Sequence, residues 1–362
     1  MFESSIVVRP EPKGSAGYAA SSRLQAAGLP EAIARFTEAA ATVPVPAAPQ
    51  PIVIADYGAA TGHNALLPVG AAISTLRRRT RSDHSILVVH TDVPDNDFTA
   101  LFRTLAEDPD SYLAEDSGTF ASAVGRSFYE QILPSSSVML GWSSWAIQWL
   151  SKVPAPVPDH IAVAYCRGDA VRAAHARVAA RDWHEFIAFR GRELRKDGRL
   201  VVITMGVGDD GEFGYRSLLA GLLDALEELR ASGLISDDEL HRMCIPVVGR
   251  SAADFASPFA PRGRFEQLEI EHIDVFNAPD RFWAQYRVDG DARAFGARWA
   301  AFLRAAVFNA LAIGLDGGRT DPRVPQFFDR LETGVAQRMA ADPEEQQIPM
   351  AVVVLTKRHR PV

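Results

Sequence analysis

The stretch Ile52–Asn64 reads IVIADYGAATGHN, and it predicts a strand that ends in a tight turn and leads into a helix. The apolar run stops at Asp56, and two of the next six residues, Gly58 and Gly62, are glycines. Glycine lets a backbone approach a ligand where a side chain would collide with it. Ligands of open parallel sheets bind at the carboxyl ends of strands. The stretch therefore indicates a ligand site or, with no ligand, a tight turn in which Asp56 caps the helix.

The acid beside the glycines narrows the kind of ligand. The spacing is not G-x-G-x-x-G and no P-loop lysine follows, so a pyrophosphate cradle is not indicated. A carboxylate would repel phosphates but attract a positive charge, and S-adenosylmethionine carries an ammonium, a sulfonium and no phosphate. A second apolar run, SILVVHTD, ends at Asp92, whose carboxylate can accept hydrogen bonds from both hydroxyls of a ribose. The two strand ends together favour S-adenosylmethionine.

Strand-like and helix-like segments alternate through the first half of the chain. Strands are predicted at Ile52–Ala55, at Ser85–Asp92 and from Arg199 to Gly206, with helices at Asn64–Arg79 and Gly168–Lys196 between them. This alternation predicts an α/β fold, a doubly wound and mostly parallel sheet with helices on both faces.

Three regions follow from this pattern. Residues 1–205 are predicted to form the cofactor-binding core with an N-terminal arm, and residues 206–347 a mainly helical cap over the acceptor site. Ser217–Ser232 and Ala292–Leu315 are the clearest helices of the cap. Residues 348–362 are predicted to return to the core sheet as a strand, Pro349–Arg358.

Composition limits the class of protein. The 362 residues are 47% hydrophobic and carry a net charge of −7, which argues against a general nucleic-acid binder. No apolar run is long enough to cross a membrane, and the first residues lack the pattern of a secretory signal. Only two cysteines occur, Cys166 and Cys244, so a reducing cytoplasm is expected. The abundance of Ala, Arg, Gly and Pro is typical of a GC-rich bacterial gene.

Four blocks in order resemble the SABATH family of S-adenosylmethionine-dependent carboxyl methyltransferases. They are GYAASSRLQ at 17–25, IADYGAATGHN at 54–64, DVPDNDFTALF at 92–102 and SFYEQILPSSSVMLGWSSWAIQWLSKVP at 127–154. The family methylates small-molecule carboxylates and some ring nitrogens. The resemblance covers nearly the whole chain and implies the Rossmann-like fold of class I methyltransferases, with no metal requirement.

The resemblance also implies a role for each matching position. The methionine end of the cofactor is expected beside Tyr18, Ser22, Asp56, Gly58 and Asn64. The ribose is expected at Asp92, and the adenine at Val93, Ser127 and Phe128. Gln25 and Trp149 are expected to grip the substrate carboxylate and so to be the catalytic residues.

The chain departs from the family in three places. Trp145 and Gln148 stand where the family has a tyrosine and a histidine, and His63 replaces a proline. Trp145 and Gln148 are expected to contact substrate, with Gln148 as a further hydrogen-bond donor. His63 is interpreted as a turn histidine rather than a general base. The spacing of Trp142, Trp145 and Trp149 also fits one face of a core helix, and Trp142 is predicted to be core.

The expected acceptor is a small apolar acid, either a fatty acid of modest length or a simple aromatic acid. Residues predicted to line its site are apolar or aromatic: Met205, Tyr215, Leu219, Phe255, Phe282, Leu303 and Phe308. An N-methyltransferase of a small heterocycle, a nicotinamide-dependent oxidoreductase and a non-catalytic cofactor-binding protein stay as alternatives. No nucleic acid or membrane partner is expected, and a homodimer is left open.

Overall fold

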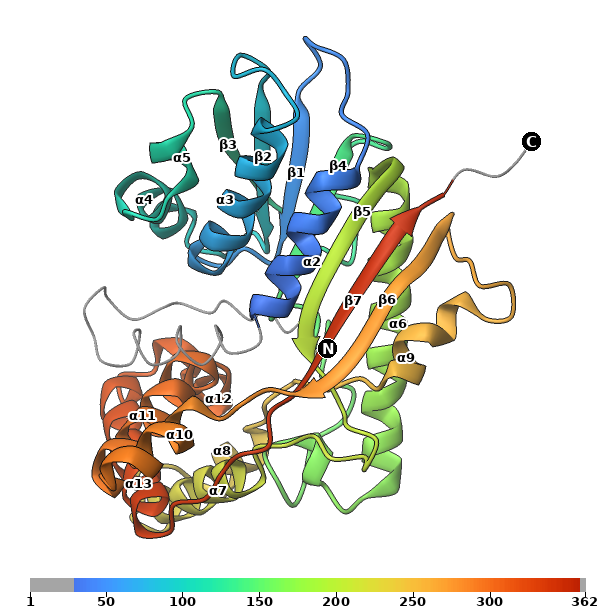
Figure 1. Ribbon diagram of the computed structural model, residues 1–362. Coiled ribbons are helices and arrows are strands. Elements are labelled where there is room, and N and C mark those ends of the chain that lie inside the picture. The colour runs from blue at the N-terminus through green and yellow to red at the C-terminus, as the bar shows by residue number, and fades with distance from the viewer. Residues whose placement is uncertain (1–28, 359–362) are drawn as a thin grey trace.

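The computed structural model describes residues 29–358 and contains a seven-stranded sheet covered by helices on both faces (Figure 1). Across the sheet the strands are β3 (Thr119–Gly125), β2 (Ile86–Asp92), β1 (Ile52–Tyr57), β4 (Val138–Ser144), β5 (Leu194–Met205), β7 (Pro349–Lys357) and β6 (Leu268–Asn277). The first five are parallel, and β7 is antiparallel to both β5 and β6. The predicted doubly wound, mostly parallel sheet is therefore confirmed, with the C-terminal strand inside it.

Side chains of the strands alternate between two apolar layers. Ile52 and Ile54 of β1 face the layer of α2 (Leu29–Thr42) and α3 (His63–Arg77), whereas Tyr57 faces the opposite layer. The first layer also contains α4 (Phe98–Glu107) and α5 (Tyr112–Glu115). The opposite layer is formed by α6 (Asp169–Glu193) and α9 (Ala252–Ala256). Because both faces of the parallel strands are covered, these strands read as nearly continuous apolar runs.

A separate group of helices lies beyond the carboxyl ends of the parallel strands (Figure 1). It contains α7 (Arg216–Ala231), α8 (Asp237–Arg242), α10 (Arg281–Asp289), α11 (Ala292–Ala306), α12 (Phe308–Leu311) and α13 (Val324–Ala341). Short 3-10 turns are η1 (Val163–Tyr165), η2 (Ser257–Phe259), η3 (Ala312–Gly314) and η4 (Gly318–Thr320). We call the helices α7, α8 and α10–α13 the cap.

The region predicted as a helical cap, 206–347, also contributes β6 to the core sheet. The prediction missed this strand because β6 is an edge strand with Glu269, Glu271 and Asp274 along it, so no apolar run marks it. The edge strand β3 was missed as well, since Phe120 is exposed and its neighbours are small.

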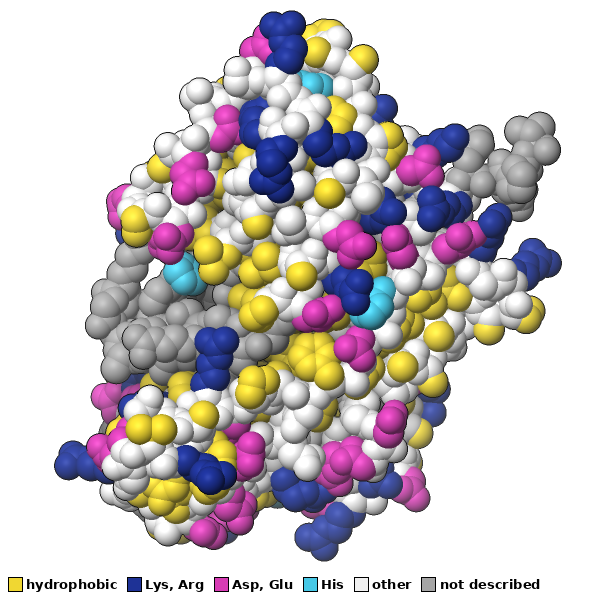
Figure 2. Space-filling view, in the orientation of Figure 1, with side chains coloured by type: hydrophobic (Ala, Val, Ile, Leu, Met, Phe, Trp, Pro, Cys, Tyr) yellow, Lys and Arg dark blue, Asp and Glu magenta, His cyan; other side chains and the backbone are white. Residues whose placement is uncertain are grey.

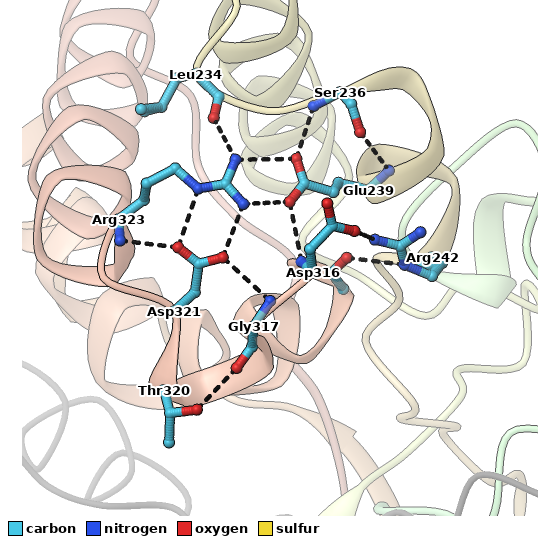
Figure 3. Close-up of polar contacts among 10 residues, drawn as sticks. Leu234, Ser236, Glu239, Arg242, Asp316, Gly317, Thr320, Asp321 and Arg323 are labelled. Carbon is cyan, nitrogen blue, oxygen red and sulfur yellow. Dashed lines mark hydrogen bonds and ion pairs between the residues drawn. The ribbon is translucent and has the colours of Figure 1, made fainter.

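A polar cluster around Arg323 joins three parts of the cap (Figure 3). The guanidinium of Arg323 pairs with Asp321 and Glu239, and it donates to the Leu234 carbonyl oxygen at 3.0 Å. Glu239 is 1% exposed and also accepts from the backbone N–H groups of Ser236 and Asp316. The hydrogen bonds from Arg323 lower the pKa of Glu239 to about 2. This cluster fixes α8 against the start of α13.

The predicted helix through the tryptophans is wrong. Trp142 lies in β4, and Trp145 has a φ of 56°, in the left-handed region. The carbonyl oxygens of Ile147 and Trp149 accept from the distant Arg250 and Tyr129 side chains instead of from a helical turn. Spacings of three and four residues placed the rings on one helical face, but distant side chains hold this segment in an irregular path. Trp142 is fully buried, as predicted.

Other boundaries also differ from prediction, most clearly those of β5 and of the helix that follows Asp291. β5 starts at Leu194, directly after α6, so the strand begins five residues before the predicted Arg199. The predicted helix Ala292–Leu315 is divided at Val307 into α11 and α12.

Candidate functional site

A cleft opens at the carboxyl ends of the central strands. It encloses about 750 Å³, counting the part open to solvent. Its lining residues are Gly58, Ala60, Asp92, Val93, Asn96, Ser127, Phe128, Tyr129, Trp145, Ala146, Trp149, Leu150 and Ser151. They follow β1, β2, β3 and β4, and β1 lies between β2 and β4, where the strand order reverses. Open α/β sheets bind their ligands at this switch point.

The turn after β1 is closed tightly over the sheet. The N–H groups of Gly58 and Ala59 both donate to the Thr91 carbonyl oxygen at 2.9 Å. Gly58 has a φ of 84°, and a Cβ atom at this position would lie 2.3 Å from Ala146 Cβ. A side chain at Gly58 is therefore excluded both by its backbone conformation and by contact with the opposite wall of the cleft.

Asp92 lies at the end of β2 with its carboxylate held in place. Its oxygens accept from the N–H groups of Ala60 and Val93 at 2.7 and 2.8 Å. Burial raises the pKa of the Asp92 carboxyl to about 6, against the effect of these two donors, and the negative charge of Asp56 adds to the increase. The Asp92 carboxylate, with the buried charge of Asp56 behind it, favours a ligand that carries positive charge and hydroxyl groups.

Asp56 lies beneath the turn and does not line the cleft. It is 2% exposed, and its Oδ2 is 2.8 Å from His90 Nδ1. His90 Nε2 is in turn 2.7 Å from the Tyr112 hydroxyl. The N-cap of α3 is Gly62, with no side-chain cap, so the alternative in which Asp56 caps the helix is wrong. The carboxylate is fixed instead by a buried chain of hydrogen bonds.

The loop after β3 brings aromatic side chains to the cleft. Phe128 packs edge-on against Tyr129 and against Phe186 of α6, with ring centroids 4.7 and 5.7 Å apart. The Phe128 carbonyl oxygen accepts from the fully buried Arg190 of α6 at 2.8 Å. The loop that carries Ser127 and Phe128 is thus anchored to the helix layer behind it.

Two of the predicted acceptor residues, Trp145 and Trp149, lie on the wall formed by 145–151. The indole N–H of Trp145 is buried and has no hydrogen-bond acceptor among the described residues. Gln148 points away from this wall, because its Oε1 accepts from the Thr204 hydroxyl at 2.9 Å and the residue is 5% exposed. The expected donor role of Gln148 therefore lacks support from its position.

The remaining predicted residues fall outside the cleft wall. Met205 is half-buried at the end of β5, and Tyr215 and Leu219 are buried in the apolar core that the cap shares with the sheet. Phe255 packs on Trp183 in the layer of α6, so the prediction that it lines the acceptor site is wrong. Phe282, Leu303 and Phe308 are buried within the same core as Tyr215.

The other predicted residues belong to the start of the chain and to the start of α3. Tyr18, Ser22 and Gln25 lie outside the described residues. Asn64 lies in the first turn of α3. His63 is the first residue of this helix, and its Nδ1 is 3.5 Å from an Asp108 oxygen.

Sequence reasoning missed Asn96 and Tyr129 as residues of the cleft. Asn96 donates from Nδ2 to the Ala60 carbonyl oxygen at 2.7 Å and so ties the loop after β2 to the turn after β1. Both residues stand inside the blocks that carry the family resemblance, so those blocks contained the signal for them.

The described part of the chain also bears on metals, membranes and partners. Within residues 29–358 no three His, Cys, Asp or Glu side chains are grouped so that they could hold a metal ion. In the same range, no helix combines the length and apolar character of a membrane span. Basic and acidic side chains are interspersed on the face in Figure 2.

Comparison with known proteins identifies the family. The sequence model described as "SAM dependent carboxyl methyltransferase" matches residues 6–358. The chain is 28% identical to salicylate carboxymethyltransferase of Clarkia breweri over 250 residues, which cover 66% of this chain and 67% of that protein. It is 27% identical to indole-3-acetate O-methyltransferase 1 of Oryza sativa subsp. japonica over 318 residues, 78% and 75% of the two chains. A structure of loganic acid methyltransferase with SAH shares the fold, with a TM-score of 0.75 at 22% identity over 97% of this chain and 99% of that one. The chain therefore belongs to the S-adenosylmethionine-dependent carboxyl methyltransferases, the SABATH family, and is an enzyme that uses this cofactor.

Proposed function

We propose that the enzyme esterifies the carboxylate of a small apolar acid, a fatty acid of modest length or a simple aromatic acid. The observation that carries the proposal is the composition of one cleft. Its lining combines Asp92 at the end of β2 with Trp145 and Trp149 of the segment after β4. A cationic cofactor would lie against Asp92, and an apolar acceptor would lie against the tryptophans.

The cleft residues near Asp92 suit the nucleoside half of the cofactor. Asp92, in its ionised form, can accept hydrogen bonds from both ribose hydroxyls. Val93, Ser127 and Phe128 lie around the same opening, where the adenine is proposed. The lack of a side chain at Gly58 lets the turn after β1 pack directly against Ala146. The methionine half is proposed beside Tyr18, Ser22, Gly58 and Asn64, with Asp56 beneath the turn acting through its charge.

When bound, S-adenosylmethionine supplies a methyl group that carries the positive character of the sulfonium. A carboxylic acid has a pKa near ~4, so at neutral pH the acceptor is already an anion and needs no general base. The protein's task is to hold the carboxylate in line with the methyl group. Such positioning is worth about 7–11 kcal/mol of the barrier.

Neutral hydrogen-bond donors suit this task. Trp149 and Gln25 are proposed to orient the carboxylate through N–H groups, which fix the oxygen atoms without neutralising their charge as an arginine would. The apolar tail of the acceptor would extend toward the end of β5 and the cap, where Met205, Tyr215 and Leu219 belong to or pack on one apolar core.

A cytoplasmic location and a bacterial source are part of the proposal. Both cysteines are free, as expected in a reducing compartment. A homodimer stays the candidate assembly, and light scattering of the purified protein would decide it.

A substrate screen tests the proposal. The purified enzyme is incubated with S-adenosylmethionine and with fatty acids of graded length, benzoic and salicylic acids, and indolic acids. We expect methyl esters from the apolar acids and none from polar acids of equal size. The Asp92→Ala variant is the control and should lose most turnover at limiting cofactor. Preferential turnover of polyhydroxylated acids would contradict the apolar acceptor. A melting temperature raised by NAD but not by S-adenosylhomocysteine would contradict the cofactor assignment.

A further inference from the structure

Two segments that line the cleft are joined by one tyrosine. Tyr129 belongs to the loop after β3, next to Ser127 and Phe128. Its hydroxyl donates to the carbonyl oxygen of Trp149 at 2.7 Å. Burial raises the pKa of the Tyr129 hydroxyl, so this group keeps its proton and stays a donor at neutral pH.

The loop that carries Tyr129 is held rigidly from behind. Arg190 donates to the carbonyl oxygens of Phe128 and Glu130, both at 2.8 Å. Glu193 accepts from the N–H groups of Ile132 and Leu133 at 2.6 and 3.0 Å. Both side chains are fully buried and bond each other, with Arg190 Nη2 2.9 Å from Glu193 Oε1. A buried ion pair of this kind resists displacement, since breaking it would leave an unpaired charge.

The same ion pair reaches the turn of the cofactor site. The Tyr57 hydroxyl donates to Glu193 at 2.8 Å, and the Arg190 guanidinium lies 4.3 Å from the centre of the Tyr57 ring. Tyr57 directly precedes Gly58. The loop 127–133 and the turn after β1 are therefore fixed to a common frame.

The segment that carries Trp149 is held on its other side. Ser151 donates to the fully buried Asp182 from both N–H and hydroxyl, each at 2.7 Å. The Ile147 carbonyl oxygen accepts from Arg250 at 2.6 Å. These bonds anchor the residues that flank Trp149. The Trp149 backbone N–H donates to the Ala146 carbonyl oxygen at 3.1 Å, and Tyr129 supplies the side-chain bond to the Trp149 carbonyl oxygen.

We propose that Tyr129 is a positioning residue. It fixes the position of Trp149 relative to the loop 127–133, which lines the proposed cofactor site. The proposal rests on the proposed function, in which the Trp149 indole N–H orients the substrate carboxylate. The hydroxyl of Tyr129 fixes the main chain of Trp149 at a distance defined by the loop 127–133. The Arg190–Glu193 pair in turn fixes that loop to the cofactor turn. Trp149 is therefore already in position to bind the substrate carboxylate before the substrate enters the cleft.

The test is a double-mutant cycle of Tyr129→Phe and Trp149→Phe in the full chain. Tyr129→Phe removes one hydroxyl and keeps the ring on Phe128. We expect KM for the preferred acid to rise roughly three- to tenfold, as loss of one hydrogen bond would produce. The dissociation constant of S-adenosylhomocysteine, measured by calorimetry, should change less than about twofold. In the Trp149→Phe background, Tyr129→Phe should have little further effect, because both act through the same N–H group.

Tyr165→Phe is the matched control. It removes a tyrosine hydroxyl that donates to another backbone carbonyl, that of Gly214, at 2.6 Å. Any effect of Tyr165→Phe on the acceptor KM should be independent of Trp149→Phe, so the two effects should multiply in the double variant. Thermal melts of all variants confirm that each is folded.

Different results would overturn the inference about Tyr129 and the proposed function. If Trp149→Phe is impaired while Tyr129→Phe keeps the wild-type KM, or if the two effects multiply, Tyr129 does not act through Trp149 and the inference is wrong. If Tyr129→Phe weakens S-adenosylhomocysteine as much as the acid, its role is in the cofactor pocket and the inference is again wrong. If the wild-type enzyme esterifies no acid, the proposed function itself fails.

Discussion

Replacing Gly58 by alanine should destabilise the fold and weaken cofactor binding. The loss in the free energy of unfolding has two parts that can be estimated from the structure. The first part is backbone strain, because φ at Gly58 is 84° and an L-residue there costs about 1–2 kcal/mol. The second part is overpacking, because the new Cβ would lie 2.3 Å from Ala146 Cβ, and such insertions cost about 1–3 kcal/mol. We expect the free energy of unfolding to fall by about 2–5 kcal/mol in total.

Two other glycines separate these parts. Gly62 has a φ of 78°, and its nearest neighbour to a new Cβ is Leu101 Cγ at 3.5 Å, an ordinary contact. Gly211 has the same φ of 78° with nothing within 4 Å. Gly62→Ala and Gly211→Ala should therefore lose only the strain part, about 1–2 kcal/mol. The excess in Gly58→Ala measures the contact with Ala146.

The assay is urea denaturation of the three variants, with calorimetric titration of S-adenosylhomocysteine. Gly58→Ala should also weaken the cofactor at least tenfold, since relief of the clash moves Ala146 and the wall of the cleft with it. Equal stability losses in all three variants, with unchanged cofactor affinity in Gly58→Ala, would refute the close approach of the two walls.

Three further predictions concern other parts of the molecule. Since the pKa of Asp92 is raised to about 6, cofactor affinity should rise as pH increases from 5 to 7, and the apoprotein should lose stability as pH rises from about 4 to about 6. Asp92→Asn should flatten both profiles, and a flat wild-type profile by calorimetry would contradict the ribose role. Trp149→Phe should lower kcat/KM about ten- to a hundredfold in steady-state assays while cofactor affinity stays within about twofold, and full activity would make Trp149 a packing residue only. Arg323→Met should leave Glu239 buried without its cation and lower the free energy of unfolding by about 2–4 kcal/mol in urea denaturation. Because the folded pKa of Glu239 is depressed to about 2, its stabilisation is present above about pH 4.5 and should be lost as pH falls through 2.

The sequence allowed the central strands to be predicted, because strands buried on both faces leave apolar runs, which end here close to Asp56 and Asp92. It did not reveal β6, whose charged edge carries no apolar run. The backbone path of residues 145–151 could not be predicted from the sequence either. Arg250, Tyr129 and Asp182 decide that path from distant positions, and local spacing of aromatic residues mimicked a helix.

The candidate site divides in the same way. Gly58, Asp92, Val93, Ser127, Phe128, Trp145 and Trp149 do line one cleft, and they belong to blocks with a recognisable pattern. Gln148 and Phe255 point elsewhere, because a residue's direction in a loop depends on partners such as Thr204 and Trp183 that local sequence does not identify. Residues of the cap were predicted from apolar character alone, which marks core and binding site alike.

The position of the transferred methyl group tests the central claim most directly. The enzyme is given S-adenosylmethionine labelled in its methyl group together with an apolar acid, and the product is then treated with mild base. A methyl ester releases its label as volatile methanol, whereas an N-methyl group withstands this treatment. We predict that the label becomes volatile in full and in proportion to the acid consumed. A labelled product that survives base, or no labelled product from any carboxylic acid, would contradict the assignment of carboxyl methylation.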